Sequence, residues 1–313
     1  MPSKTNPSQS RLDRRWRPPA FLWIRRQRSN WVKTSLVLGI ITAIIAVAMP
    51  AQALLARLSP TSPQLGDTLS IAIEQNPTLN STPTVKMGGK TYPAFVTSSG
   101  GFRALLPTTP LDKPGPVQIQ VSAGGEVKNL TVSLRDRTFP TQRIRLSGAA
   151  GAEATQLELD RVAAFKKLET PEKYWKGSFV KPNGGRVSTG YGLRRYYNGV
   201  FAKDYYHRGV DYAGGMGSPV VSPAAGRIAL VGRVSEGFRV HGNCVGIDHG
   251  QGVTSIMMHL SRIDVREGQL VQAGQKIGAV GSTGAATGPH LHWGLYVHGL
   301  SVDPAPWREQ GFE

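Results

Sequence analysis

Histidine and aspartate residues in two short segments have the types and spacing that a catalytic metal site requires. His207 and Asp211 are four positions apart with Gly209 between them, and His290 and His292 are two positions apart. If the second segment is a β-strand, alternation places both of its imidazoles on one face. A glycine in the first segment allows the backbone to bend so that its two neighbours can point at one centre. Three nitrogen or oxygen ligands and an open fourth position are what a catalytic zinc ion needs, so these segments predict a zinc centre.

Together with His259, which follows an apolar run, these residues occur in an order that resembles the lysostaphin and LytM-type zinc metallopeptidases, which cut peptides of the bacterial cell wall. The resemblance covers a little over a third of the chain, and every motif residue is present. It implies that His207, Asp211 and His292 hold one zinc ion. It also implies that His259 and His290 are the catalytic residues beside the water on the metal, in a domain with the duplicated hybrid motif fold.

The expected reaction is hydrolysis of a peptide bond in peptidoglycan stems or cross-bridges. A zinc ion in an open site lowers the pKa of its water to about 7. The chain has no H-E-x-x-H motif, so no helix-borne glutamate base is expected. His259 and His290 take its place, one accepting the water proton and the other stabilising the oxyanion or protonating the leaving amine. Which histidine does which stays open, as does the bond that is cut.

Two other interpretations stay open. A non-catalytic envelope regulator would bind cell wall or activate another hydrolase, and lost metal or catalytic residues would mark it, whereas all five are present. A purely structural zinc ion would need four protein ligands, and only three are obvious, although His290 could complete the set. The sequence therefore favours a zinc metalloendopeptidase.

The elements expected to position this chemistry are β-strands and their loops. Residues 253–260 alternate so that Ser255, Met257 and His259 share one face, which directs His259 into a groove. Four tyrosines stand in the stretch before His207, and one of their hydroxyl groups could donate to a developing oxyanion. They are Tyr196, Tyr197, Tyr205 and Tyr206.

The remaining histidines and the single cysteine are expected to have no part in the chemistry. His249 falls in a predicted hairpin turn, as a structural or solvated residue. His241 and His298 have no partner motif. Cys244 lies in a predicted strand as a small buried side chain, and one cysteine alone forms no intramolecular disulfide.

Residues 1–53 predict export from the cytoplasm. Residues 1–33 contain nine lysines and arginines against one aspartate, so they carry +8 of the formal net charge of +17. Residues 34–56 are uncharged and long enough to span a bilayer, for which about 20 suffice. An A-x-A pattern ending at Ala53 favours signal-peptide cleavage there over a retained membrane anchor. Either outcome places the rest of the chain outside the cytoplasm, in the periplasm or cell envelope.

The charge of the remaining chain, +9, would attract it to a carboxylate-rich cell wall. Nucleic acid is disfavoured as a partner because the chain is expected to be exported and has no nucleic-acid-binding motif. Peptidoglycan is therefore the expected partner, and no pattern in the sequence specifies an oligomeric state.

The predicted fold class is all-β, with four parts. Residues 1–53 are the basic N-region with its signal peptide or anchor, 54–140 an immunoglobulin-like β-sandwich that serves as a spacer or docking module, 141–178 a linker with a short helix, and 179–313 an antiparallel β-sheet metallopeptidase domain. The helix is expected over 153–168, after an extended connection. Its apolar face is expected to contain Leu157, Leu159, Val162, Ala163 and Phe165.

Overall fold

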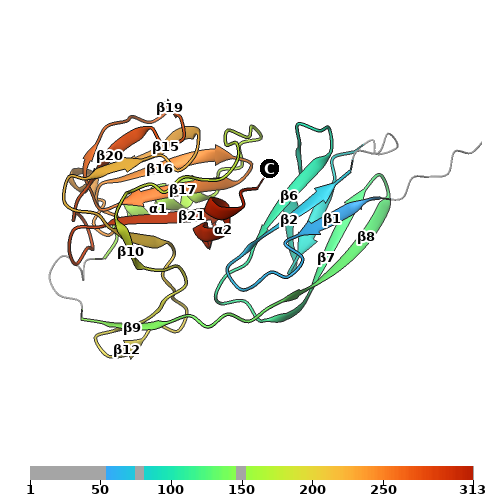
Figure 1. The fold of residues 1–313 in the computed structure, drawn as a ribbon, viewed down its shortest axis with the longest axis horizontal. Helices are drawn as coiled ribbons and strands as arrows, with labels where there is room; N and C mark the ends of the chain where they lie inside the picture. The colour runs from blue at the N-terminus through green and yellow to red at the C-terminus, as the bar shows by residue number, and fades with distance from the viewer. Residues whose placement is uncertain (1–53, 75–80, 146–152, 313) are drawn as a thin grey trace, which may run out of the picture. The chain divides into compact units, whose positions relative to one another are not determined.

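The computed structural model describes residues 54–74, 81–145 and 153–312, and this part of the chain is built almost entirely from β-strands (Figure 1). Its two α-helices are short: α1 (Gln156–Lys166) and α2 (Pro304–Glu309). The all-β prediction is therefore confirmed. The expected signal peptide or membrane anchor lies outside the described residues, and within them no helix has the length and apolar character needed to cross a membrane.

The first eight strands form two four-stranded antiparallel sheets, ordered β1-β2-β6-β5 and β4-β3-β7-β8. Buried residues of both sheets, among them Leu69, Ile71, Ile119 and Val121, form one apolar core, because alternate side chains of each strand point inward. This is the predicted two-layer sandwich. The strands are β1 (Ala56–Ser59), β2 (Thr68–Ile73), β3 (Thr84–Met87), β4 (Lys90–Pro93), β5 (Phe95–Val96), β6 (Phe102–Pro107), β7 (Gly115–Ala123) and β8 (Glu126–Leu134).

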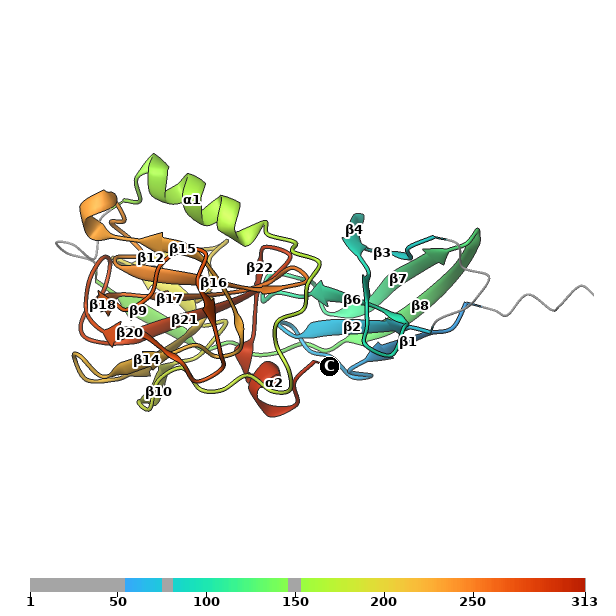
Figure 2. The same ribbon diagram turned by 90° about the horizontal axis from the view of Figure 1, so that it is seen from above.

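The C-terminal part is organised around a larger antiparallel sheet with the order β10-β13-β21-β17-β16-β15-β19, to which β22 adds by pairing with β21. Its strands are β10 (Arg186–Thr189), β13 (Val210–Ala213), β15 (Gly226–Gly232), β16 (Cys244–Gly250), β17 (Val253–Met258), β19 (Leu270–Val271), β21 (Leu291–Val297) and β22 (Leu300–Val302). One face packs on a core that contains Tyr212, Trp293 and Trp307, all fully buried. Helix α1 lies along the other face, where Phe165 packs with Leu230 and Cys244 (Figure 2).

Two small sheets complete this part. One has the order β14-β20-β18 and the other β12-β11-β9. The predicted extended connection after the sandwich therefore contributes a strand, β9, and this strand pairs with β11 in parallel. The strands are β9 (Thr141–Ile144), β11 (Arg194–Tyr197), β12 (Val200–Phe201), β14 (Pro219–Val221), β18 (Leu260–Ile263) and β20 (Lys276–Val280).

The linker helix is present, but its length and its buried face differ from the prediction. It starts after Thr155, whose hydroxyl caps the N–H of Glu158, and it ends at Lys166. The buried positions are Glu158, Val162 and Phe165, which recur at helical spacing. The predicted apolar face was wrong at Leu157 and Leu159, which are about half exposed, and at Ala163, which is also exposed. A carboxylate takes the inner position because it accepts hydrogen bonds from a loop beneath the helix.

The hairpin between β16 and β17 also differs from the prediction. Strand β16 continues through His249, and the turn is made at Gln251 and Gly252, both with positive φ. His249 is fully buried, with Nδ1 hydrogen-bonded to the Ala225 carbonyl oxygen and Nε2 to the Ser255 hydroxyl, both at 2.9 Å. It is a structural residue of the strand and not a turn residue.

Candidate metal centre and its groove

Three of the predicted site residues meet at the junction of β13 and β21. Asp211 lies on β13 directly opposite His292 on β21, and His207 lies on the loop that enters β13. The three side chains are buried. His207 Nε2 is 3.1 Å from Asp211 Oδ1 and 3.1 Å from His292 Nδ1, and His292 Nδ1 is 2.9 Å from Asp211 Oδ1. Antiparallel pairing thus brings together residues that are 81 positions apart in the chain.

The chemistry of these three atoms fits a bound cation. Nδ1 of His207 donates to the Gly190 carbonyl oxygen at 2.8 Å, which leaves the lone pair of Nε2 directed at the Asp211 carboxylate. His207 Nε2 and Asp211 Oδ1 are then two acceptors 3.1 Å apart, and they repel each other unless a positive charge lies between them. Ligand atoms of a tetrahedral zinc site are separated by about 3.3 Å, given bonds of about 2.0 Å. The observed separations are close to that value, so the donor set fits zinc with an open side.

Gly209 is needed beside the centre because any larger residue would place a Cβ too close to β21 and His292. A Cβ at this position would lie 2.3 Å from the Trp293 carbonyl oxygen and 2.7 Å from His292 Nε2. Its φ is not in the left-handed region, so the predicted special bend is not the reason for a glycine here. The glycine allows β21 and the imidazole of His292 to approach the backbone of the ligand loop closely.

The two remaining histidines flank the three ligand residues. His290 precedes β21, and its Nδ1 donates to the Gly288 carbonyl oxygen, so that Nε2 faces the centre at 3.9 Å from Asp211 Oδ1. His259 uses Nδ1 in the same way, with the Thr283 carbonyl oxygen at 2.9 Å. The rings of His259 and His290 are 4.8 Å apart. In both rings Nδ1 is thus engaged by a carbonyl oxygen, which leaves Nε2 as the nitrogen free to act in the groove.

His259 lies in the groove because of its backbone conformation, which strand alternation did not predict. The expected continuous strand breaks at this residue, which has a φ of 63° and separates β17 from β18. The left-handed residue reverses the alternation, so Leu260 and Met257 both enter the core, whereas Met258 and His259 line the groove. The predicted face was thus wrong for Met257, although His259 does lie in the groove.

Burial sets the protonation of the centre. It lowers the pKa of His292 to about 4, and together with the neighbouring His290 it lowers the pKa of His259 to about 3. Burial raises the pKa of Asp211, but hydrogen bonds with His207 and His292 outweigh this and hold the pKa well below its usual range. At neutral pH the imidazoles of His259 and His292 are therefore neutral, and the Asp211 carboxylate is ionised.

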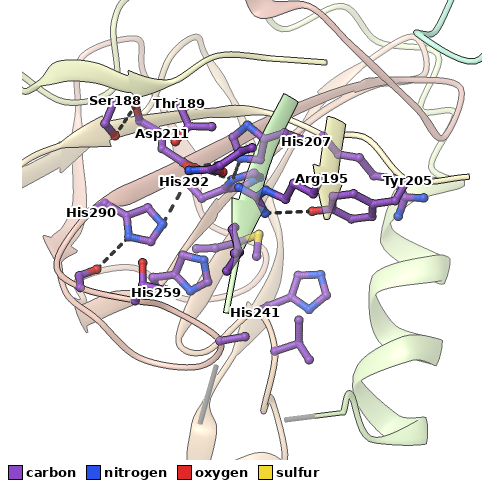
Figure 3. A pocket seen from close by; sticks show the side chains of 18 of the residues that line it. Ser188, Thr189, Arg195, Tyr205, His207, Asp211, His241, His259, His290 and His292 are labelled. Carbon is purple, nitrogen blue, oxygen red and sulfur yellow. Dashed lines mark hydrogen bonds and ion pairs between the residues drawn. The ribbon is translucent and has the colours of Figure 1, made fainter. Parts of the chain in front are cut away.

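The centre opens into a groove of about 680 Å³. Figure 3 shows His259 and His290 on one side of the three ligand residues, and Arg195 and Tyr205 on the other. Tyr197 also lines the groove, whereas Tyr206 is buried in the core beside Tyr191. The linker contributes Gln142 and Ile144 from β9 and Lys166 from α1.

Two groove residues were missed from the sequence. His241 lines the groove and has a partner after all, because Glu158 on α1 binds its Nδ1 at 2.6 Å. The two residues are 83 positions apart, and no local pattern connects them. Arg195 also lines the groove and donates to two tyrosine hydroxyl groups. The tyrosines around it were the one available signal. His298 likewise has a partner, Glu169, at 2.8 Å, outside the groove.

Comparison with known proteins agrees with this geometry. The model of peptidase family M23 matches residues 205–304. The DD-carboxypeptidase/endopeptidase Mpg of Neisseria meningitidis is 40% identical over 119 residues, and the peptidoglycan DD-endopeptidase ShyA of Vibrio cholerae is 37% identical over 118 residues. Each match covers 38% of this chain and 26% of the relative, so the chain spans about a quarter of these proteins. A crystal structure from Pseudomonas aeruginosa, named as an M23 peptidase, is 27% identical and has a TM-score of 0.59, covering 80% of this chain and 96% of that one.

Proposed function

Because residues 205–304 match peptidase family M23, we propose that the chain is a zinc-dependent endopeptidase that hydrolyses peptide bonds of peptidoglycan outside the cytoplasm. The observation that carries the proposal is the convergence of three ligand atoms, from His207, Asp211 and His292, in a groove that also contains His259 and His290. The names of the relatives Mpg and ShyA support peptidoglycan as the substrate.

In this proposal His207, Asp211 and His292 hold the zinc ion through Nε2, Oδ1 and Nδ1. Bound there, zinc would supply Lewis acidity, which makes water a nucleophile near neutral pH and polarises a carbonyl oxygen. The hydrogen bond from His207 Nδ1 to Gly190 fixes the orientation of that ring. Such supporting contacts maintain a metal site's geometry.

The proton transfers fall to the two flanking histidines. His290 Nε2 is near the ligand atoms and carries a lone pair, so it can accept a proton from the attacking water. The ring of His259 lies next to that of His290 and can stabilise the oxyanion or return a proton to the leaving amine. Tyr205 lies across the groove, and burial raises the pKa of its hydroxyl above the usual value, so the hydroxyl stays protonated and able to donate.

The division of the chain follows the same proposal. Residues 179–313 contain all five residues of the centre, but the groove also needs the linker of 141–178, which contributes Gln142, Ile144 and Lys166. We therefore assign catalysis to these two segments together. The sandwich of 54–140 serves as a spacer or docking module, and residues 1–53 direct export by a signal peptide or anchor.

Release of soluble peptide from purified peptidoglycan by the full chain tests the proposal. The protein is assayed after chelation and again after zinc is restored, beside the variants Asp211→Asn and His290→Asn. Matched controls are Asp264→Asn, a surface carboxylate that does not line the groove, and His298→Asn, a left-handed position that asparagine tolerates. We expect zinc-dependent release that both site variants lose and both controls keep.

A zinc-loaded chain that binds peptidoglycan and releases no peptide would refute the enzyme and support a non-catalytic regulator. Activity that survives Asp211→Asn with undiminished zinc content would instead refute the ligand assignment.

A further inference from the structure

The groove contains more positive than negative charge. Among the described residues that line it, the cationic side chains are Lys166, Arg195 and Arg208, and the only carboxylate is Asp211. Among the described residues none of these three cations has an ion pair. Each lies over a tyrosine ring instead, as with Lys166 Nζ at 4.5 Å from the ring centre of Tyr296. Burial lowers the pKa of Lys166 to about 8, so this side chain is still mostly charged at pH 7, and the groove is electropositive once Asp211 is engaged by its histidines or a metal ion.

Arg195 is the most firmly positioned of these cations. It lies on β11, it is half-buried, and its Nη1 donates to the hydroxyl groups of Tyr197 and Tyr205, each at 3.3 Å. The rings of these two tyrosines pack edge to face, with centres 5.6 Å apart, so the hydroxyl groups form a rigid support. The guanidinium is thereby held toward the groove, on the side of the ligand residues away from His290 (Figure 3).

The protein does not satisfy this guanidinium by itself. Arg195 Nε is buried and has no hydrogen-bond partner in the described part of the chain. The hydroxyl groups that contact Nη1 are neutral, and no carboxylate lies within ion-pair distance among the described residues. Holding a half-buried cation without a counter-ion, with a buried N–H unpaired, is unfavourable, and an anionic ligand in the groove would relieve it. An arginine so placed is suited to a carboxylate because charge-assisted hydrogen bonds are the strong ones.

We propose that Arg195 binds a free carboxylate of the peptide substrate and so makes the enzyme selective for peptides that carry one near the scissile bond. This inference rests on the proposed function and specifies its substrate class. Tyr197 and Tyr205 act as positioning residues, because they hold the guanidinium through their oxygen atoms. Arg208, which is exposed over the rings of Tyr205 and Tyr206, adds positive charge at the same side of the groove.

The test compares two forms of one substrate. Soluble muropeptides are prepared from purified peptidoglycan, either untreated or after its carboxylates have been converted to amides with carbodiimide and ammonia. The zinc-loaded full chain, Arg195→Gln and Arg195→Lys are assayed for kcat and KM on both. Arg262→Gln is the matched control, since it removes an arginine charge at an exposed site of β18.

On untreated muropeptides we expect Arg195→Gln to raise KM by about 10-fold to about 100-fold, the range for a charge-assisted hydrogen bond, with a smaller change in kcat. Arg195→Lys should recover part of this loss, because it keeps the charge. On amidated muropeptides the parent and Arg195→Gln should have the same KM, and Arg262→Gln should match the parent on both substrates.

Equal losses by Arg195→Gln on both substrates would overturn the inference, because they would show that Arg195 only maintains the structure. A parent that has the same KM for amidated and untreated muropeptides would also overturn it. If the parent cleaves neither form, the proposed function fails separately. Calorimetric binding of the same muropeptides then decides the role of Arg195, with preference for the untreated form expected in the parent and its loss in Arg195→Gln.

Discussion

Replacing Glu158 by glutamine tests whether the linker helix holds one wall of the groove in place. The Glu158 side chain is fully buried, and its oxygens accept from the backbone N–H groups of Arg239, Val240 and His241 and from Nδ1 of His241, at distances between 2.6 and 3.2 Å. The His241 carbonyl oxygen in turn accepts from the backbone N–H of His259. The carboxylate therefore fixes a loop that touches a proposed catalytic residue.

The size of the effect follows from the pKa of this carboxyl group. Burial raises the pKa of Glu158, but hydrogen bonds from the His241 side chain and from the loop backbone lower it from 4.5 to about 2. That difference corresponds to about 3 kcal/mol of folding free energy at about 1.4 kcal/mol per pKa unit. Glutamine has the same shape, but its NH₂ group cannot accept from the N–H donors. We expect the variant to be less stable by about 3 kcal/mol at pH 7.

The pH dependence has a definite sign. A carboxyl group with a lowered folded pKa stabilises the protein fully above its unfolded pKa of 4.5, and this contribution is lost as pH falls from about 4.5 to about 2. Urea unfolding of the full chain, measured from pH 7 down to pH 3, should therefore show the parent approaching Glu158→Gln in stability. Asp160→Asn is the matched control, because Asp160 is exposed on the same helix. Its stability should stay within about 0.5 kcal/mol of the parent.

Two results would refute this reasoning. One is a loss below about 0.5 kcal/mol for Glu158→Gln at pH 7, since that is the range of an ordinary surface substitution. The other is a stability difference that does not shrink on acidification, which would mean that the ionised carboxylate is not what holds the loop.

Further predictions concern the packing around the centre. Gly209→Ala should lower zinc affinity at least about tenfold, because a methyl group cannot fit beside His292 Nε2. Competition with a chromogenic chelator measures the affinity, and the control is Gly215→Ala, where nothing lies within 4 Å of an added Cβ. Unchanged affinity in Gly209→Ala would show that the ligand loop and β21 can move apart. Met257→Ala should lower the free energy of unfolding, measured in urea, by about 2–5 kcal/mol, as expected for a core methionine. Met258→Ala should lower the free energy of unfolding by less, because Met258 lines the groove. Equal losses would contradict the reversal of faces after β17.

Local patterns in the sequence predicted the β-rich fold and proposed the five residues of the centre. Alternation and glycine turns are local patterns, and they predicted a β-sandwich and a strand at His292, which lies in β21. The order of His207, Asp211, His259, His290 and His292 identified the family, because a metal site restricts residue types far more than packing does. The structure brings all five residues to one groove.

Tertiary structure alone decided which other side chains reach that groove. Glu158 meets His241 across 83 positions, and Arg195 meets Tyr205 across a loop, so neither pair leaves a periodic trace in the sequence. The left-handed backbone at His259 also escaped prediction, since a single residue with positive φ reverses strand alternation without any change in residue type. These features depend on contacts between distant segments, and such contacts exist only once the strands have paired.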